Sequence, residues 1–254
     1  MIFVTGDCHS DFRRFSSKIF YEQKEMNKDD FVIICGDFGG VWKDSPEERY
    51  WLDWLNDKPF TTLFIDGNHE NFDRLYSGEF PEVDFHGGRA HQIRESIYHL
   101  MRGYVFELQG KKFFAFGGAS SHDISDGIID RDDYDSDDAF KAAIKEWNWM
   151  GKMFRINHLS WWKEELPSDE EMQRGLDSLA AVDNAVDFVV THCCPQSIAS
   201  FMSMGAYRAD YLTEYFNDIL GRIKFKKWFF GHYHDNQVIM SDMVELYEQI
   251  IRIV

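Results

Sequence analysis

Short runs of apolar residues recur along the chain, and most of them end in a glycine or a histidine. They are MIFVTGD, FVIICGD, TTLFIDGNHE, KKFFAFGGASSHD, DFVVTHCCP and KKWFFGHYH. β-Branched and aromatic residues dominate these runs, which is typical of strands buried on both faces and followed by a loop. The pattern predicts six core strands whose carboxyl ends carry glycine or chemically active side chains.

Helical patterns separate the first three of these strands. One covers residues 12–25 and another covers residues 46–57. At the start of the second, Ser45, Pro46 and Glu48 have the types expected of an N-cap, a first helical residue and a capping-box acid. The first three strands and these helices predict consecutive βαβ units.

Polar residues follow the first three strands at a regular spacing. Asp7, Asp37 and Asn68 come at intervals of about 30 residues, the usual length of a βαβ unit. Parallel strands in such a sheet end at the same edge, and ligands of open α/β sheets bind beyond those carboxyl ends. We therefore expect an α/β fold in which these side chains meet.

The middle of the chain, from about 120 to 183, lacks this strand pattern. It holds the acidic run IIDRDDYDSDD, the tryptophan-rich pieces WNW and WW, and a helix signal opened by SDEE at Ser168. We expect a single domain over 1–254 with a helical insertion there. Two interpretations stay open: the tryptophans pack helices against the sheet, or those around Trp147, Trp149, Trp161 and Trp162 form a lid over the substrate. The C-terminal NQVIM and ELYEQIIRIV predict closing strands.

Composition and charge limit the partners and the compartment. The 44 acidic residues outnumber the 27 basic ones, giving a net charge of -17, so nucleic acid and anionic membranes are expected to be unfavourable partners. No apolar run approaches the ~20 residues needed to span a bilayer. The four cysteines, Cys8, Cys35, Cys193 and Cys194, show no metal-type spacing and suit reduced thiols. We expect a cytoplasmic protein.

The residues that follow the strands form a candidate set of metal ligands. These are Asp7, His9, Asp37, Asn68, His192, His232 and His234. Such a mixture of carboxylate, amide and imidazole suits Mn, Fe, Zn or Ni better than the oxygen-only preference of Ca or Mg. Seven ligands exceed the needs of one ion that keeps a water site, so the set predicts a centre of two divalent transition-metal ions, with Mn as the first expectation.

Five ordered motifs in this chain resemble the calcineurin-like metallophosphoesterases. They are GDCHS, GDFGG, GNHE, TH and GHYH, and they extend from residue 6 to residue 234. The resemblance implies a four-layer α-β-β-α sandwich with two mixed sheets. It also implies a metal-dependent phosphoesterase that hydrolyses a phosphomonoester or phosphodiester by attack of a hydroxide that bridges the two metals.

The resemblance further implies a role for each ligand. Asp7, His9 and His234 would hold one ion, Asn68, His192 and His232 would hold the other, and Asp37 would bridge them. His69, beside Asn68, corresponds to the family's histidine that contacts the scissile phosphate and protonates the leaving group. His122 and Asp123, which follow the fourth strand, are candidate substrate contacts.

The second motif departs from the family's protein phosphatases. Asp37 is followed by Phe38, Gly39 and Gly40, where those relatives have Gly-Asp-x-x-Asp-Arg with a phosphate-binding arginine. The candidate replacements are Arg74, Arg89, Arg94, Arg102 and Arg131, and the sequence does not select among them. We expect a small phosphorylated substrate. A serine/threonine protein phosphatase, a nuclease and a noncatalytic metal-binding scaffold remain as alternatives.

Overall fold

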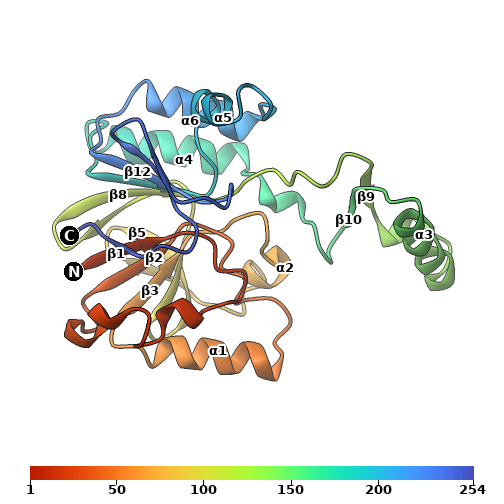
Figure 1. Ribbon diagram of the computed structural model, residues 1–254, viewed down its shortest axis with the longest axis horizontal. Helices are drawn as coiled ribbons and strands as arrows, with labels where there is room; N and C mark the ends of the chain where they lie inside the picture. The colour runs from red at the N-terminus through yellow and green to blue at the C-terminus, as the bar shows by residue number, and fades with distance from the viewer.

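The computed structural model describes residues 1–254, and its body consists of two β-sheets packed face to face between outer helices (Figure 1). The first sheet has seven strands in the order β15-β1-β2-β3-β6-β5-β4. Their bounds are β1 (Ile2–Thr5), β2 (Phe31–Ile34), β3 (Thr61–Phe64), β4 (Glu82–Phe85), β5 (Gly88–Arg94), β6 (Ile97–Leu100) and β15 (Ile251–Arg252).

The second sheet has six strands in the order β13-β14-β12-β11-β8-β7. Their bounds are β7 (Tyr104–Leu108), β8 (Lys111–Phe116), β11 (Phe188–Thr191), β12 (Lys227–Phe230), β13 (Gln237–Ile239) and β14 (Met243–Glu245). All six strands predicted from the apolar runs are present. In the first sheet β1, β2 and β3 are adjacent and parallel, as the spacing of Asp7, Asp37 and Asn68 predicts. In the second sheet β8, β11 and β12 are also adjacent and parallel.

Helices cover the outer face of each sheet. Their bounds are α1 (Pro46–Asn56), α2 (Phe72–Leu75), α4 (Asp169–Ala180), α5 (Gln196–Met202) and α6 (Tyr211–Leu220). In Figure 1, α1 lies outside the first sheet, whereas α4, α5 and α6 lie outside the second. None of the helices is both long and apolar enough to cross a membrane.

Three apolar layers hold this body together. One lies between α1 and the first sheet, where Phe38 and Phe64 stack with ring centroids 4.1 Å apart. A second, which includes Ile33 and Phe113, lies between the sheets, and the third lies under the helices of the second sheet. Fully burying one such side chain contributes about 1.5–3 kcal/mol. The expected four-layer α-β-β-α sandwich is confirmed.

The helix predicted for residues 46–57 is present, and its cap forms as expected. Ser45 Oγ accepts a hydrogen bond from the Glu48 backbone N–H at 3.1 Å. The helix predicted for residues 12–25 is wrong. Only two short 3₁₀ helices form there, η1 (Arg13–Phe15) and η2 (Tyr21–Glu25), because Ser16 has an extended backbone and the buried Gln23 amide takes up the carbonyls of Phe15 and Phe20.

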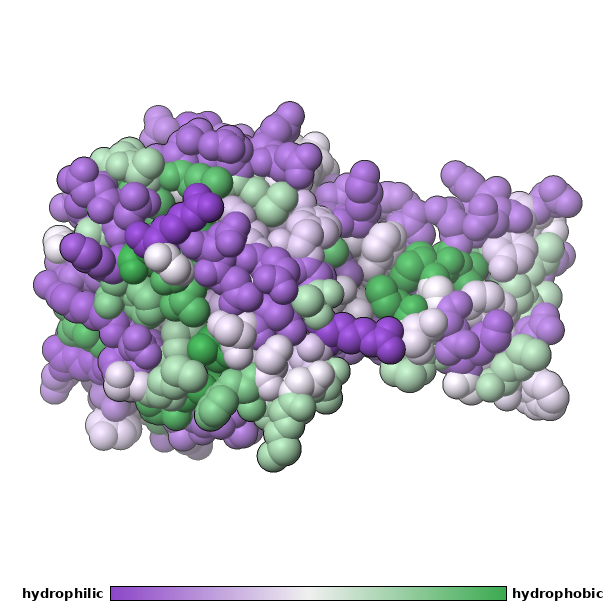
Figure 2. All heavy atoms as spheres, turned by 90° about the horizontal axis from the view of Figure 1, so that it is seen from above, coloured by the Kyte–Doolittle hydropathy of each residue, from purple (hydrophilic) through white to green (hydrophobic).

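The middle of the chain divides into a projecting part and a packed part. Residues 127–156, here called the arm, comprise β9 (Gly127–Ile129), η3 (Arg131–Asp133), α3 (Asp137–Trp149) and β10 (Phe154–Ile156), and they stand away from the body in Figures 1 and 2. Parallel pairing of β9 with β10 closes the base of the arm. Helix α4 instead packs on the second sheet through Gly175 and Leu179, with the capping box of Ser168 in place.

Candidate metal centre

Three glycines allow the loops at the carboxyl ends of the strands to approach one another. Each comes directly before one of the predicted ligands Asp37, Asn68 and His232. A Cβ atom on any of them would lie 2.1 Å from another site side chain: Gly36 from His192, Gly67 from Asp37 and Gly231 from Asp7. The glycines of the motifs are therefore required by close packing of the ligands themselves.

Four predicted ligands have a backbone conformation that L-residues rarely adopt. Their φ angles are 47° at His9, 46° at Asp37, 72° at His232 and 58° at His234. Left-handed geometry costs about 1–3 kcal/mol at a non-glycine residue, and it persists where the surrounding structure imposes it. Such strain is typical of sites that hold side chains in place for a function.

One group of ligands forms a compact cluster. The donor atoms of Asp7, His9, Asp37 and His234 all lie within 4.8 Å of one another. His9 Nε2 is 3.1 Å from His234 Nε2, which is also 3.1 Å from Asp7 Oδ2. Two imidazole nitrogens and two carboxylates thus point at one small volume, which is the arrangement that a divalent cation requires.

The second group lies on the other side of Asp37. His192 Nε2 is 3.2 Å from Asn68 Oδ1, and the rings of His192 and His232 are 5.0 Å apart. His192 Nδ1 is 2.8 Å from the carbonyl oxygen of Cys35. That carbonyl accepts a hydrogen bond from Nδ1–H, which leaves Nε2 as the nitrogen that can bind a metal; such an outer contact is common behind metal-binding histidines.

Asp37 links the two groups through its two carboxylate oxygens. Oδ2 is 3.7 Å from His9 Nε2, whereas Oδ1 is 3.4 Å from His192 Nε2. Burial raises the pKa of Asp37, but the charge of and hydrogen bond to His192 outweigh this, so the pKa lies well below its usual range. The residue is an ionised carboxylate placed between both sets of donors.

The electrostatics of the centre favour a cation. Burial lowers the pKa of His192, but the carboxylates of Asp37 and Asp7 outweigh it and raise the pKa to about 10. Burial lowers the pKa of His9 and His232, and so favours the neutral imidazoles that bind metals. The two carboxylates thus stabilise positive charge at His192, whether a proton or a metal ion carries it. The donor set fits divalent metals of the Mn, Fe and Zn type.

His69 lies beside this centre. Its backbone N–H donates to Asp37 Oδ1 at 2.7 Å, and its ring faces that of His9 at 5.3 Å. Burial lowers the pKa of His69, the Asp37 carboxylate acts against that shift, and the nearby Arg155 guanidinium adds to it. The imidazole is therefore predominantly neutral at pH 7 before substrate binds.

A hydrogen-bond chain orients Asn68. Ser121 Oγ donates to Glu165 Oε2 at 2.6 Å and accepts from Asn68 Nδ2 at 3.3 Å. A hydroxyl has one proton, so its bond to the carboxylate obliges it to accept from the amide nitrogen. Asn68 Oδ1 is thereby turned toward His192 and the centre. Neither Ser121 nor Glu165 was a candidate from the sequence, because no local motif marks them.

His122 and Asp123 lie beside the same centre in different ways. The His122 ring is 4.6 Å from that of His232 and 5.9 Å from that of Tyr207, so it lines the site. The Asp123 carboxylate accepts a 2.6 Å hydrogen bond from Arg155 Nε. It is therefore engaged by an arginine rather than free to face a ligand.

The five arginines proposed from the sequence all have acidic partners. These pairs are Arg74 with Glu48 and Glu79, Arg89 with Glu82 and Asp84, Arg94 with Asp53, Arg102 with Asp66, and Arg131 with Asp137. The arginine that reaches His69 is instead Arg155 of the arm. It lies 86 positions from His69 in the chain, so no sequence spacing indicates it.

The tryptophan-rich pieces lie in two different environments. Trp162 is buried in the core beside the first sheet, and its Nε1 donates to Asp73 at 2.7 Å, so it packs the segment that follows the arm onto the body. Trp149 is 86% exposed at the end of α3. Of the two interpretations of these tryptophans, packing therefore fits Trp162. Trp149 is exposed and does not lie over the metal centre.

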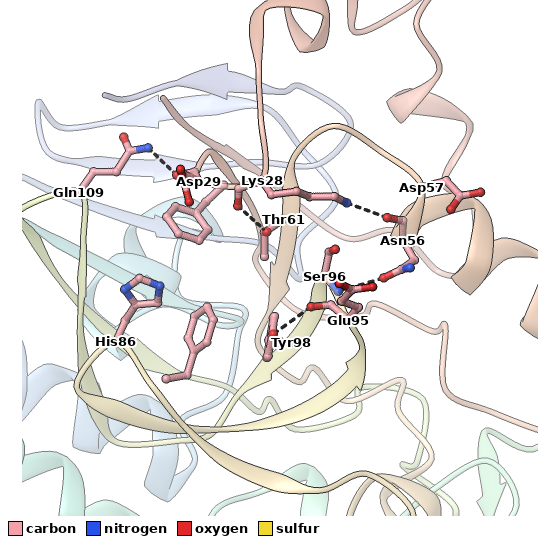
Figure 3. Close-up of a pocket in the computed structure, with 12 residues that line it drawn as sticks. Lys28, Asp29, Asn56, Asp57, Thr61, His86, Glu95, Ser96, Tyr98 and Gln109 are labelled. Atoms are coloured by element: carbon pink, nitrogen blue, oxygen red, sulfur yellow. Dashed lines mark hydrogen bonds between the residues drawn. The ribbon is translucent and has the colours of Figure 1, made fainter.

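A large cavity lies elsewhere in the molecule. It measures about 680 Å³ and includes Phe31 and Thr61, the first residues of β2 and β3, so it lies at the amino ends of strands whose carboxyl ends carry the ligands (Figure 3). Its acidic side chains are Asp29, Asp57 and Glu95, and the Lys28 ammonium is bonded to the Asn56 carbonyl. Such a lining disfavours an anion.

Comparison with known proteins decides the family. The sequence matches the profile of the calcineurin-like phosphoesterases over residues 1–236. The chain belongs to this family. The family takes its name from phosphoesterase activity, and it uses divalent metals.

Two curated relatives are lariat debranching enzymes. Lariat debranching enzyme A of Xenopus laevis is 29% identical over 152 residues, which cover 54% of this chain and 27% of that protein. The lariat debranching enzyme of Danio rerio is 28% identical over 140 residues, which cover 49% of this chain and 23% of that protein. The aligned part of the chain spans about a quarter of the length of each relative.

The expectation of a small substrate and no nucleic acid is wrong. The relatives are named for debranching lariats, which are branched nucleic acids. The expectation rested on the net charge of -17, and that number sums the whole chain. It does not describe the few side chains around the candidate metal centre, which include Arg155 and several histidines.

Proposed function

We propose that this protein is a metal-dependent phosphodiesterase that hydrolyses phosphodiester bonds of a nucleic acid at a binuclear centre. The family and the two debranching relatives support the reaction class and the type of substrate. The four cysteines are free and buried, which fits a reducing compartment such as the cytoplasm.

The observation that carries the proposal is the placement of Asp37. Its two carboxylate oxygens face donors of two different groups, His9 on one side and His192 on the other. A site for one ion needs no carboxylate between two groups of donors. A site for two ions does, because a shared ligand has to lie between them. The buried, ionised state of Asp37 supports the same role.

Two ions would be held by the residues that the structure gathers around Asp37. Asp7, His9 and His234 would bind one ion, Asn68, His192 and His232 would bind the other, and Asp37 would be shared; Mn is the metal that we propose. When bound, such ions supply an activated water and neutralise charge on the phosphoryl group.

His69 would act on the substrate rather than on a metal. We assign it to contact the phosphoryl group and donate a proton to the leaving oxygen, a contribution worth roughly 100- to 10,000-fold in rate. Its fixed backbone bond to Asp37 holds it at the edge of the centre. An incoming phosphodiester adds negative charge there, which favours the protonated imidazole that this step needs.

The test is turnover by the purified, Mn-loaded protein on four substrates: a linear dinucleotide, a branched oligonucleotide, a phosphomonoester and a phosphopeptide. We expect hydrolysis of the diesters, loss of activity after chelation, and recovery when Mn is restored. Asp84→Asn, at a side chain that is 92% exposed, is the control that should leave turnover unchanged. Hydrolysis of the phosphopeptide alone, or of none of the four with metal bound, would contradict the proposal.

A further inference from the structure

The arm delivers an arginine to the edge of the metal centre. Arg155, on β10, has one terminal guanidinium nitrogen 3.2 Å from Nδ1 of His69 and the other 3.3 Å from Nε2. A neutral imidazole has one acceptor nitrogen and one N–H, so the guanidinium can donate to at most one of the two ring nitrogens. The two groups therefore lie against each other, and most of the donating capacity on that side of Arg155 is unused.

The position of Arg155 is fixed from two other sides. Its Nε donates to Asp123 Oδ1 at 2.6 Å, and a terminal nitrogen donates to the Ser160 carbonyl at 2.9 Å. The side chain is only 13% exposed. Of the five N–H donors of a guanidinium, these two bonds use two, and at most one of the remaining three can be donated to His69. An arginine held this firmly has already lost most of the rotamer entropy that binding a ligand would cost.

The guanidinium of Arg155 lies beside the His69 imidazole with its positive charge only partly compensated, so an anion would bind favourably there. Arg155 and the imidazole do not attract each other as an ion pair would, and the one carboxylate bound to Arg155, that of Asp123, lies on its Nε side. The second sequence motif has Phe38, Gly39 and Gly40 directly after Asp37, and none of these three residues has a cationic side chain. A planar fork with free N–H groups matches the non-bridging oxygens of a phosphate.

We propose that Arg155 is a substrate-binding residue of this centre, and that its guanidinium holds the non-bridging oxygens of the scissile phosphodiester beside His69. This inference rests on the proposed phosphodiesterase function and adds the arm to it. The arm thereby adds a guanidinium to the site, and Asp123 acts as a positioning residue that orients Arg155.

The test compares Arg155→Ala and Arg155→Lys with Arg131→Ala. Arg131 is the matched control because it also belongs to the arm, is 42% exposed and pairs with the exposed Asp137. Two quantities are measured on Mn-loaded protein: the affinity for inorganic phosphate by calorimetry, and kcat/KM for bis(p-nitrophenyl) phosphate. Metal content and thermal unfolding are recorded for every variant.

A hydrogen-bonded ion pair with phosphate predicts a loss of roughly 10- to 100-fold in both quantities for Arg155→Ala. Arg155→Lys should recover part of the phosphate affinity, because it restores the charge without the fork. Arg131→Ala should match the unsubstituted protein, and all variants should keep their metal. Asp123→Asn should give a smaller loss than Arg155→Ala, since it frees the guanidinium without removing it.

The inference would be overturned if Arg155→Ala changed neither the phosphate affinity nor kcat/KM. Equal losses in Arg155→Ala and Arg131→Ala would also overturn it, because they would show an effect through folding of the arm. Phosphate binding does not require turnover, so the two proposals fail separately. If the protein hydrolysed no diester, the proposed function would fail, whereas a selective loss of phosphate affinity in Arg155→Ala would still support the role of this residue.

Discussion

Removal of the Ser121 hydroxyl should weaken one metal site without touching any ligand. In the structure this hydroxyl accepts a hydrogen bond from Asn68 Nδ2 and donates one to Glu165 Oε2. Ser121→Ala leaves the amide free to rotate by half a turn, so that its NH₂ group faces the centre in place of its oxygen. An amide NH₂ group cannot bind a cation, so the protein cannot bind metal through Asn68 while the amide is rotated.

The structure sets the size of this effect. Substitutions behind a metal ligand typically cost about 10- to 100-fold in metal affinity. The variant also leaves two buried polar atoms short of a partner, Asn68 Nδ2 and one oxygen of Glu165, at about 1–3 kcal/mol each in folding stability. Because the Ser121 backbone N–H still donates to Glu165 Oε1 at 3.0 Å, we expect the loss of folding stability to lie at the lower end of its range.

The assay is calorimetric titration of metal-free protein with Mn, in parallel with activity as a function of Mn concentration. Ser121→Ala should weaken one of two binding steps roughly 10- to 100-fold, and excess Mn should restore most of the activity. Ser120→Ala is the matched control, since its hydroxyl takes no part in this chain. Equal Mn affinities for the two variants would show that the orientation of Asn68 does not depend on Ser121, and the reasoning would be refuted.

Three further predictions concern single residues. Asp37→Asn should abolish or severely weaken binding of both ions, and elemental analysis that still finds two Mn per chain would exclude a bridging role. His69→Ala should keep both ions yet slow an alkyl phosphodiester about 100-fold or more, with a clearly smaller effect on a p-nitrophenyl ester, whose leaving group needs no proton; loss of metal would instead make His69 a ligand. Burial, aided by His99, lowers the pKa of His91 to about 4, so the unfolded chain binds the extra proton first as the pH falls below about 6.5, and stability should drop by on the order of 2 kcal/mol by pH 4. Denaturant unfolding across this range checks it, and His91→Phe should flatten the profile.

The strands, and the placement of the candidate ligands at their carboxyl ends, were predictable because both signals are local. An apolar run predicts a buried strand, and the residue directly after that strand must lie at the carboxyl edge of the sheet. The same local logic failed at residues 12–25. There the spacing of Phe12, Phe15 and Phe20 suits a helix, but Ser16 is extended and the Gln23 side chain supplies hydrogen bonds that a helix would have supplied itself.

Long-range contacts account for what the sequence did not reveal. Arg155 and Glu165 belong to a segment that the sequence marks only as acidic and rich in tryptophan, and their roles arise from where the arm meets the body. The expected exclusion of nucleic acid failed for a related reason. Net charge is summed over the chain, whereas recognition depends on the charges that face the ligand.

The two sheets contribute different halves of the metal centre, and this links metal binding to the packing of the body. Asp7, His9, Asp37 and Asn68 follow strands of the first sheet, whereas His192, His232 and His234 follow strands of the second. Each ion would take ligands from both sheets, so the ions bind only the arrangement in which the sheets are packed. Binding that favours one arrangement stabilises it by mass action. It also offsets the cost of the strained backbones of His9, Asp37, His232 and His234.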